Sequence, residues 1–137
     1  MTGLDVIEKG ISNIKKYLSI LSSYKDKSIT DLLNDLTLRG AAERYLYLAV
    51  QATIDLAEAI ISYKELRRPS TFSESFEILN EHNIISKEVK TNMLQMAGFR
   101  NRLAHDYGDI NYNVIHDVLI NRLTDIESFL EEISKKL

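Results

Sequence analysis

The chain of 137 residues contains no cysteine and no tryptophan, and it has one proline and five glycines. The absence of cysteine excludes disulfides, thiol nucleophiles and cysteine-ligated metal sites. The three histidines, His82, His105 and His116, are not spaced as a helical zinc-binding pair, so we expect no metal site. The scarcity of glycine and proline disfavours a sheet protein with many tight turns, and no standard phosphate-binding loop is present.

Long apolar runs and an excess of basic charge are also missing. The apolar runs are interrupted by charged residues, so we expect no segment that spans a bilayer. Asp5 and Glu8 stand where a secretory signal would need a basic start and an apolar run, so we expect a cytoplasmic protein. Because 17 Lys and Arg oppose 20 Asp and Glu, any nucleic-acid binding must come from a local cluster.

The apolar residues that are present recur at helical spacing along nearly the whole chain. Within a single domain of residues 1–137, they predict an all-α, up-and-down bundle of four main helices with one additional short helix. The second helix is expected as one long helix or two nearly collinear ones, with Gly40 as its weak point. The expected bounds are, in chain order, Leu4 to about Lys25, about Ile29 to Leu66, Phe72 to about His82, Ser86 to about Gly108, and Asp109, Asn111 or Asn113 to Leu137. Broad apolar stripes on the second and last helices favour a symmetric homodimer.

The clearest break in this pattern is "RRPST", at residues 67–71. Pro69 disfavours helix at the residue before it, and Thr71 with Glu74 has the form of a capping box that begins the next helix. Arg67 and Arg68 form a small basic group here that could extend a groove for RNA.

A second unusual segment is "GFRNRLAHDYG", residues 98–108, which gathers polar side chains at one helix end. On an ideal helix Arg100 and Tyr107 share a face, and Asn101 and His105 share another. Arg100 and His105 point about 140° apart, so only a long arginine or a loosened helix would bring both to one phosphate. Arg102 lies four residues before Asp106, which predicts an ion pair between them.

The residue types in this segment allow RNA cleavage by the RNA's own 2′-hydroxyl. A histidine titrates near neutral pH and can take or give the proton, so His105 would be the acid or base. An arginine holds phosphate oxygens in a forked contact, so Arg100 would stabilise the charge that builds on phosphorus. The same side chains would also complement the negative end of a helix without any function. On the residues alone, both explanations stay open.

The other residues that could form sites have simpler structural explanations. His82 is expected at a helix end, and His116 at the surface of a first helical turn. Met93 and Met96 are expected to fill the core. The tyrosines Tyr45, Tyr47 and Tyr63 are expected to pack, and Arg39 with Glu43 to form an ion pair.

Four segments of the chain together resemble the HEPN superfamily, specifically its HepT-like ribonuclease toxins. The segment "FRNRLAHDY" has the form Arg-Asn-x3-His-x-Tyr, which is similar to the signature of that family. "LRGAAERYLYLAVQATIDLAEAII" resembles the long second helix of the family, "PSTFSESFEILNEHNIIS" its proline-led segment, and "VKTNMLQMAGFRNRLAHDYGDIN" its catalytic stretch. The resemblance covers nearly the entire chain.

The resemblance implies an all-helical homodimer in which two copies of the motif meet in a cleft. It implies a metal-independent endoribonuclease toxin of a type VII-like toxin–antitoxin pair, without a cofactor. Arg100 and His105 would be catalytic, and Asn101 would support them. Apart from the resemblance, Arg102, Arg67 and Arg68 are basic residues that could bind RNA. The implied partner is an MNT-type nucleotidyltransferase antitoxin, which would attach AMP from ATP to Tyr107.

Two alternatives to the hypothesis of a ribonuclease toxin stay open. The first is a non-catalytic dimeric helical module that docks a nucleotidyltransferase. The second is a purely structural helical dimer with no effect on RNA. The presence of Arg100, Asn101, His105 and Tyr107 together favours the enzyme, because a docking module would not need this combination.

Overall fold

The computed structural model describes residues 2–105 and 110–137, and every regular element within these residues is helical. The elements are α1 (Gly3–Ser22), α2 (Ile29–Asn34), α3 (Leu36–Tyr63), α4 (Phe72–Glu81), α5 (Lys87–His105), α6 (Tyr112–Asp117), the π-helical segment η1 (Val118–Arg122) and α7 (Leu123–Lys136). The all-α bundle expected from the hydrophobic pattern is therefore confirmed.

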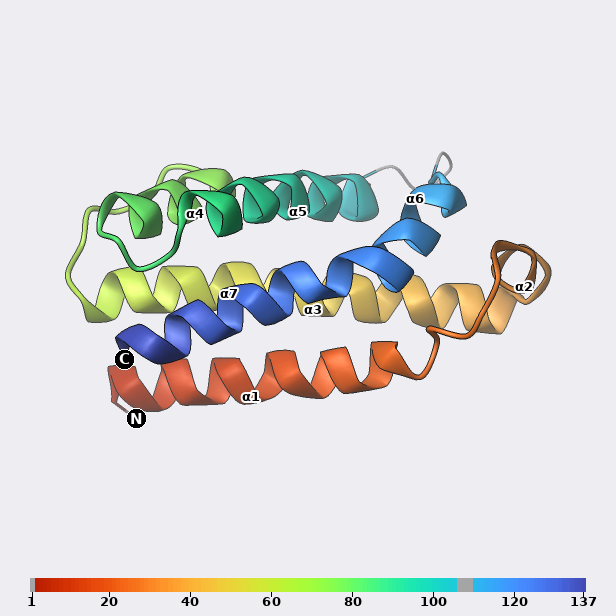
Figure 1. The fold of residues 1–137 in the computed structure, drawn as a ribbon, viewed down its shortest axis with the longest axis horizontal. Coiled ribbons are helices and arrows are strands. Elements are labelled where there is room, and N and C mark those ends of the chain that lie inside the picture. Colours follow the sequence, from red (N-terminus) through yellow and green to blue (C-terminus); the bar gives the residue numbers. More distant parts are fainter. Residues whose placement is uncertain (1, 106–109) are drawn as a thin grey trace.

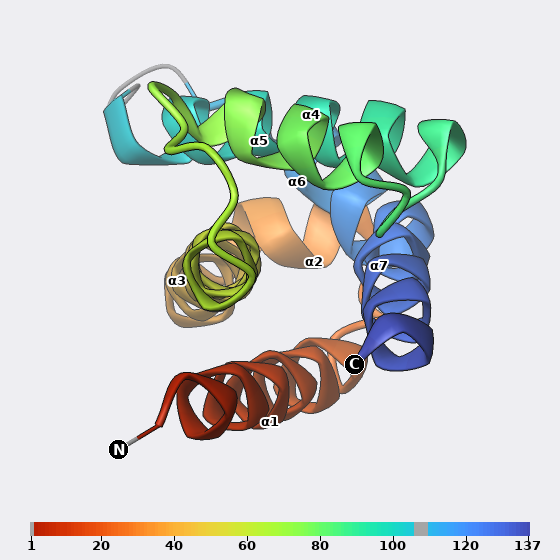
Figure 2. The same cartoon turned by 90° about the vertical axis from the view of Figure 1, so that its left-hand side faces the viewer.

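The long helices pack around a common core with both chain ends at one end of the bundle (Figure 1). Figure 2, which looks along the bundle, shows α3 and α7 on opposite sides, α4 and α5 as a layer above them, and α1 below. The core includes buried residues of α1, α3, α4, α5, α6 and α7. Phe76 of α4 meets Phe129 of α7 nearly edge to face, with ring centroids 5.6 Å apart, and both side chains are buried. Met93 and Met96 also lie in this core, as expected.

The helix expected from Ile29 to Leu66 is interrupted at Asp35 and not at Gly40. Asp35 has extended backbone angles (φ −123°, ψ 98°), and its carboxylate accepts from the backbone N–H groups of Thr37 and Leu38. A short aspartate side chain can satisfy these N–H groups outside a helix, so it stops α2 and starts α3 at one residue. In Figure 2, α3 is seen end-on and α2 from the side, so the two helices are not collinear.

Replacing Asp35 with alanine is expected to lower the free energy of unfolding by about 1 kcal/mol, because two backbone N–H groups lose their acceptor. Urea unfolding followed by circular dichroism would measure this loss. The Asp35→Asn variant is the matched control, since its amide oxygen can still accept both hydrogen bonds. An alanine variant as stable as wild type would contradict this account of the break.

Two other expectations about the helices need correction. The last helix begins at Tyr112 with Asn111 as its cap, but it contains a π-helical segment at Val118–Arg122. His116 is not a surface histidine, because it is partly buried and its Nε2 lies 3.0 Å from the carbonyl oxygen of Lys27. This contact joins α6 to the segment between α1 and α2. His82 is the C-cap of α4, as expected.

The expectation that no segment could span a membrane was too strong. By length and composition, α3 is long and apolar enough to do so. Half of its most apolar stretch is buried within the bundle, where it packs on α1, α4 and α5. The core helix of a water-soluble fold passes the same test, so the finding is weak evidence for a membrane span.

Candidate active site

The polar cluster predicted from the sequence lies at the C-terminal end of α5. This helix continues without a break to His105, so the helical spacing of Arg100, Asn101 and His105 holds. Arg100 is half-buried, whereas Asn101 and His105 are exposed. Asp106 and Tyr107 lie outside the described residues. The expected ion pair between Arg102 and Asp106 and the expected shared face of Arg100 and Tyr107 therefore stay predictions.

Residues of α3 hold the guanidinium of Arg100 across the helix interface. Its Nε donates to Oε1 of Gln51 at 2.8 Å, and its Nη2 donates to the hydroxyl of Tyr47 at 3.3 Å. Its Nη1 donates to Oδ1 of Asn101, the next residue on α5, at 3.2 Å. All three nitrogens of the side chain therefore have a partner. Because Tyr47 and Gln51 are four residues apart, they lie one above the other on the same face of α3.

Two aromatic rings pack against the same guanidinium. The Arg100 Cζ lies 4.9 Å from the ring centroid of Phe72 and 5.4 Å from that of Tyr47. A guanidinium is planar and weakly hydrated, so it stacks readily on aromatic faces. Phe72 is the first residue of α4 and is placed there by the cap Thr71, whose hydroxyl accepts from the N–H of Glu74. Three helices thus fix the orientation of one arginine.

Gln51 has a second hydrogen bond that fixes its own amide. Its Nε2 donates to Oδ1 of Asp55 at 2.9 Å, one helical turn further along α3. An amide whose nitrogen donates to a carboxylate must present its oxygen on the other side. That oxygen is the acceptor for Arg100.

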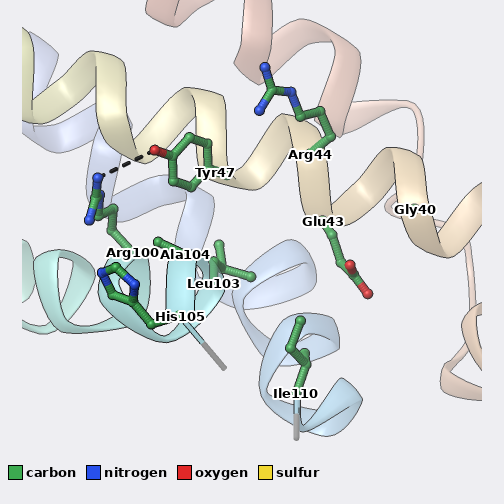
Figure 3. A pocket seen from close by; sticks show the side chains of 9 residues that line it. All are labelled: Gly40, Glu43, Arg44, Tyr47, Arg100, Leu103, Ala104, His105 and Ile110. Atoms are coloured by element: carbon green, nitrogen blue, oxygen red, sulfur yellow. Dashed lines mark hydrogen bonds between the residues drawn. The ribbon is translucent and has the colours of Figure 1, made fainter. Parts of the chain in front are cut away.

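Two open hollows meet at Arg100 and His105. The first has a volume of about 560 Å³ and is lined by α3 residues including Arg44 and Tyr47, opposite Arg100 and His105 (Figure 3). The second, of about 520 Å³, is lined by Arg100, Asn101 and His105 together with the start of α4. The expected 140° separation of Arg100 and His105 therefore does not keep them apart. The arginine is long enough to reach the surface that the histidine occupies within one chain.

Glu58 is the acidic residue of the second hollow. Burial raises the pKa of its carboxyl group, and the nearby charge of Asp55 raises this pKa further. On the other side of the site, Tyr112 of α6 lies beside Glu43, and this carboxylate and partial burial raise the pKa of the phenol. The guanidinium of Arg39 lies 4.7 Å from the Tyr112 ring centroid. Within the described residues, Arg39 makes this contact in place of the expected ion pair with Glu43.

The three arginines predicted to bind RNA do not line the two hollows around Arg100. Arg67 forms ion pairs with Glu74 at 2.6 Å and Glu81 at 2.7 Å. The hydrogen bond to Arg67 lowers the pKa of the Glu81 carboxyl group. Because Glu74 binds Arg67, it does not complete the expected capping box with Thr71.

Arg68 and Arg102 line other parts of the surface. Arg68 borders a hollow at the end of α3, beside Glu58 and Glu65. Arg102 borders a small groove between α5 and α6 that includes Phe99. A role for Arg67, Arg68 or Arg102 in RNA binding stays a prediction.

Sequence reasoning missed the residues that hold Arg100. Tyr47 was expected only to pack, but its hydroxyl accepts a hydrogen bond from Arg100. Gln51, Asp55 and Phe72 were not singled out as functional, because no local pattern marks them. Arg44 was missed in the same way, and it lines the first hollow. Among the described residues, no group of three or more histidine or acidic side chains could hold a metal ion.

The chain is similar to known nucleases over almost its entire length. A family model described as "Ribonuclease HepT-like" matches residues 11–133. The chain is 31% identical over 130 residues to the mRNA nuclease HepT of Shewanella oneidensis, covering 94% of this chain and 96% of that protein. It is 29% identical over 139 residues to the tRNA nuclease HepT of Aphanizomenon flos-aquae, covering 100% of this chain and 95% of that protein.

Solved structures show the same similarity in three dimensions. The fold matches a tri-AMPylated HEPN toxin of Shewanella oneidensis in complex with an MNT antitoxin, with a TM-score of 0.87 and 29% identity. That match covers 98% of this chain and 99% of the toxin. A toxin–antitoxin structure with AMP-PNP also matches with a TM-score of 0.87 and 29% identity, covering 96% of this chain and 98% of that one.

Proposed function

The chain belongs to the HepT-like ribonuclease family, and on this premise we propose that it is an endoribonuclease toxin with Arg100 and His105 as its catalytic residues. The observation that carries the proposal is the arrangement at the end of α5. A firmly held guanidinium and an exposed imidazole line the same two hollows. A proton-transfer group beside a fixed positive charge can promote cleavage of an RNA phosphodiester.

The proposed reaction is an attack of the ribose 2′-oxygen on the adjacent phosphorus. His105 accepts the proton of the 2′-hydroxyl as the bond from oxygen to phosphorus forms. The bond from phosphorus to the 5′-oxygen breaks, that oxygen takes a proton from a general acid, and a 2′,3′-cyclic phosphate remains. The N–H groups of Arg100 bind the non-bridging oxygens and stabilise their growing charge. Asn101 supports this geometry through its hydrogen bond with Arg100. These steps require no metal ion.

We further propose that two copies of the chain form the working enzyme. Each chain has one His105, and a second copy with its motif in the same cleft would supply a second proton-transfer group. The reaction needs a base for the 2′-hydroxyl and an acid for the 5′-oxygen, so two imidazoles would serve both roles. The first hollow, open to the surface beside Arg44 and Tyr47, leaves room for an RNA strand.

The partner in this proposal is an MNT-type nucleotidyltransferase that attaches AMP to Tyr107. Support comes from the matched Shewanella oneidensis toxin, which is tri-AMPylated and bound to an MNT antitoxin. Tyr107 follows His105 by two residues, so an attached nucleotide would bring a phosphate close to the cationic end of α5. Both proteins would act in the cytoplasm, where RNA and ATP are present.

Expression in bacteria tests the proposal directly. Wild-type protein is expected to stop growth and degrade cellular RNA, and the His105→Ala variant to do neither. The control is His82→Ala, which changes an exposed histidine at the end of α4. Purified wild-type protein should cleave RNA equally well with and without a metal chelator. Toxicity of His105→Ala equal to wild type would contradict the role of the histidine. RNA left intact by wild type would favour the docking-module alternative.

A further inference from the structure

We propose that Gln51 and Asp55 are positioning residues that set the orientation of Arg100 for the phosphate, an inference that rests on the proposed nuclease function. Neither residue belongs to the motif at the end of α5. Asp55 is exposed, and Gln51 is only partly buried. Their link to the site is a chain of two hydrogen bonds, from Arg100 Nε to Gln51 at 2.8 Å and from Gln51 Nε2 to Asp55 at 2.9 Å.

The first step of the argument concerns the direction of the Gln51 amide. A glutamine can present either its oxygen or its NH2 group to a neighbour. The carboxylate of Asp55 only accepts hydrogen bonds, so it selects the orientation in which the NH2 group faces it. The opposite orientation would place the NH2 group against the N–H of Arg100, with two donors facing each other. Asp55 therefore leaves the side-chain oxygen of Gln51 facing the Nε–H of Arg100 as its acceptor.

The second step concerns which donors of Arg100 remain. A guanidinium carries five N–H groups. Gln51, Tyr47 and Asn101 take one each, on different nitrogens. Two N–H groups remain, one on each terminal nitrogen, and these can bind two oxygens of one phosphate in a fork. The rings of Phe72 and Tyr47 against the guanidinium restrict its rotation.

The third step explains why an amide and not a carboxylate contacts Arg100. Arg100 forms no ion pair with any carboxylate in the part of the chain that the structure describes. Gln51 separates the negative charge of Asp55 from the guanidinium by one neutral side chain. The positive charge of Arg100 is thus available to the phosphate, while its direction is still fixed. Arg67 of the same protein differs, because two carboxylates bind its guanidinium directly and oppose its positive charge.

A double-mutant cycle in kcat tests the inference on purified protein with an RNA substrate. Gln51→Leu removes the acceptor, and Asp55→Asn allows the Gln51 amide to turn over. Each is expected to lower kcat by about 10- to 100-fold, because a misplaced catalytic group loses much of its effect. KM should change by less than about threefold, since phosphate binding in the ground state needs less exact alignment. The double variant should equal Gln51→Leu alone, because Asp55 acts only through Gln51.

A remote pair of the same kind is the matched control. Asn121 Nδ2 donates to Oδ1 of Asp117 at 2.9 Å, also four residues apart on an exposed helix face. Asn121→Leu and Asp117→Asn should leave kcat unchanged. Thermal unfolding of all variants would show that they fold. Additive losses in the double variant, or kcat within about twofold of wild type in both single variants, would overturn the inference.

A second measurement separates this inference from the nuclease proposal. The Nε proton of Arg100 can be followed by nuclear magnetic resonance, and its exchange with water should be slow while Gln51 accepts it. Exchange should become at least tenfold faster in Gln51→Leu and in Asp55→Asn. Wild-type protein that cleaves RNA no faster than Arg100→Ala would refute the nuclease proposal, and the exchange rates would still decide the positioning role. Unchanged exchange in both variants would refute the positioning role even in an active nuclease.

Discussion

Replacing Arg100 with alanine is expected to lower kcat for RNA cleavage by about 10²- to 10³-fold, because the reaction loses its fixed positive charge at the phosphate. The structure gives a reason for an effect at the upper end of this range. The guanidinium is already held by Gln51, Tyr47 and Phe72, so little reorganisation is needed when charge develops. Initial rates on a short labelled RNA, measured over a range of substrate concentrations, would give kcat and KM.

A lysine at position 100 is expected to restore little of this activity. An ammonium group keeps the charge, but it cannot donate to both α3 partners and still offer a fork to the phosphate. The matched control is Arg102→Ala, because Arg102 lies two residues away on the same helix and lines a different groove. If Arg102 contacts RNA, its loss should raise KM and leave kcat nearly unchanged. An Arg100→Ala enzyme within about threefold of wild type would refute the catalytic role of the guanidinium.

Replacing Tyr107 with phenylalanine is expected to abolish transfer of labelled AMP from ATP by the nucleotidyltransferase partner. In the proposed reaction the phenol oxygen attacks the α-phosphorus, the bond to the β-phosphate breaks, pyrophosphate leaves, and the phenol proton passes to a base. Phenylalanine has no oxygen to make this bond. The loss should therefore be complete, and it would be measured as radioactivity retained on the protein after denaturing electrophoresis.

Tyr112→Phe is the matched control for the labelling experiment. Tyr112 is another tyrosine close in sequence, but its ring lies against Arg39 and its phenol beside Glu43. This variant should accept as much label as wild type. Wild type that has been labelled should no longer cleave RNA, whereas Tyr107→Phe should stay active and toxic in the presence of the partner. Labelling that persists in Tyr107→Phe would place the modified residue elsewhere.

Much of the fold could be predicted because hydrophobic periodicity reports directly on helices. The order and type of the main helices followed from it. The bounds were less certain where a side chain competes with the helix for backbone N–H groups. Asp35 fits a helical pattern as well as its neighbours do, and only its three-dimensional structure shows that its carboxylate caps the next helix. The weak point of this helix was instead expected at Gly40, whose low helix propensity does not interrupt α3.

The candidate site around Arg100 and His105 was predictable only in part, because some of its residues are close in sequence and others are brought together only by the fold. Arg100 and His105 stand in one short segment, so their residue types and spacing were visible in the sequence. Their partners come from α3 and α4, and tertiary contacts over 49 and 53 residues leave no local pattern at Gln51 or Tyr47. The ideal-helix angle between Arg100 and His105 was also misleading. It describes the Cβ directions, whereas the end of a long arginine is placed by the groups that bind it.

The position of Arg100 along the chain has a consequence for how such a toxin is made. Most of the groups that orient its guanidinium lie in α3 and α4 and are synthesised earlier, but α5 also packs on α7, which is synthesised later. A nascent chain on the ribosome would therefore carry the arginine and its partners before α5 has made all of its packing contacts. If the chain acts as the proposed toxin, full activity would be expected only once α7 has emerged and packed, which would give an antitoxin translated nearby time to bind before the first cleavage.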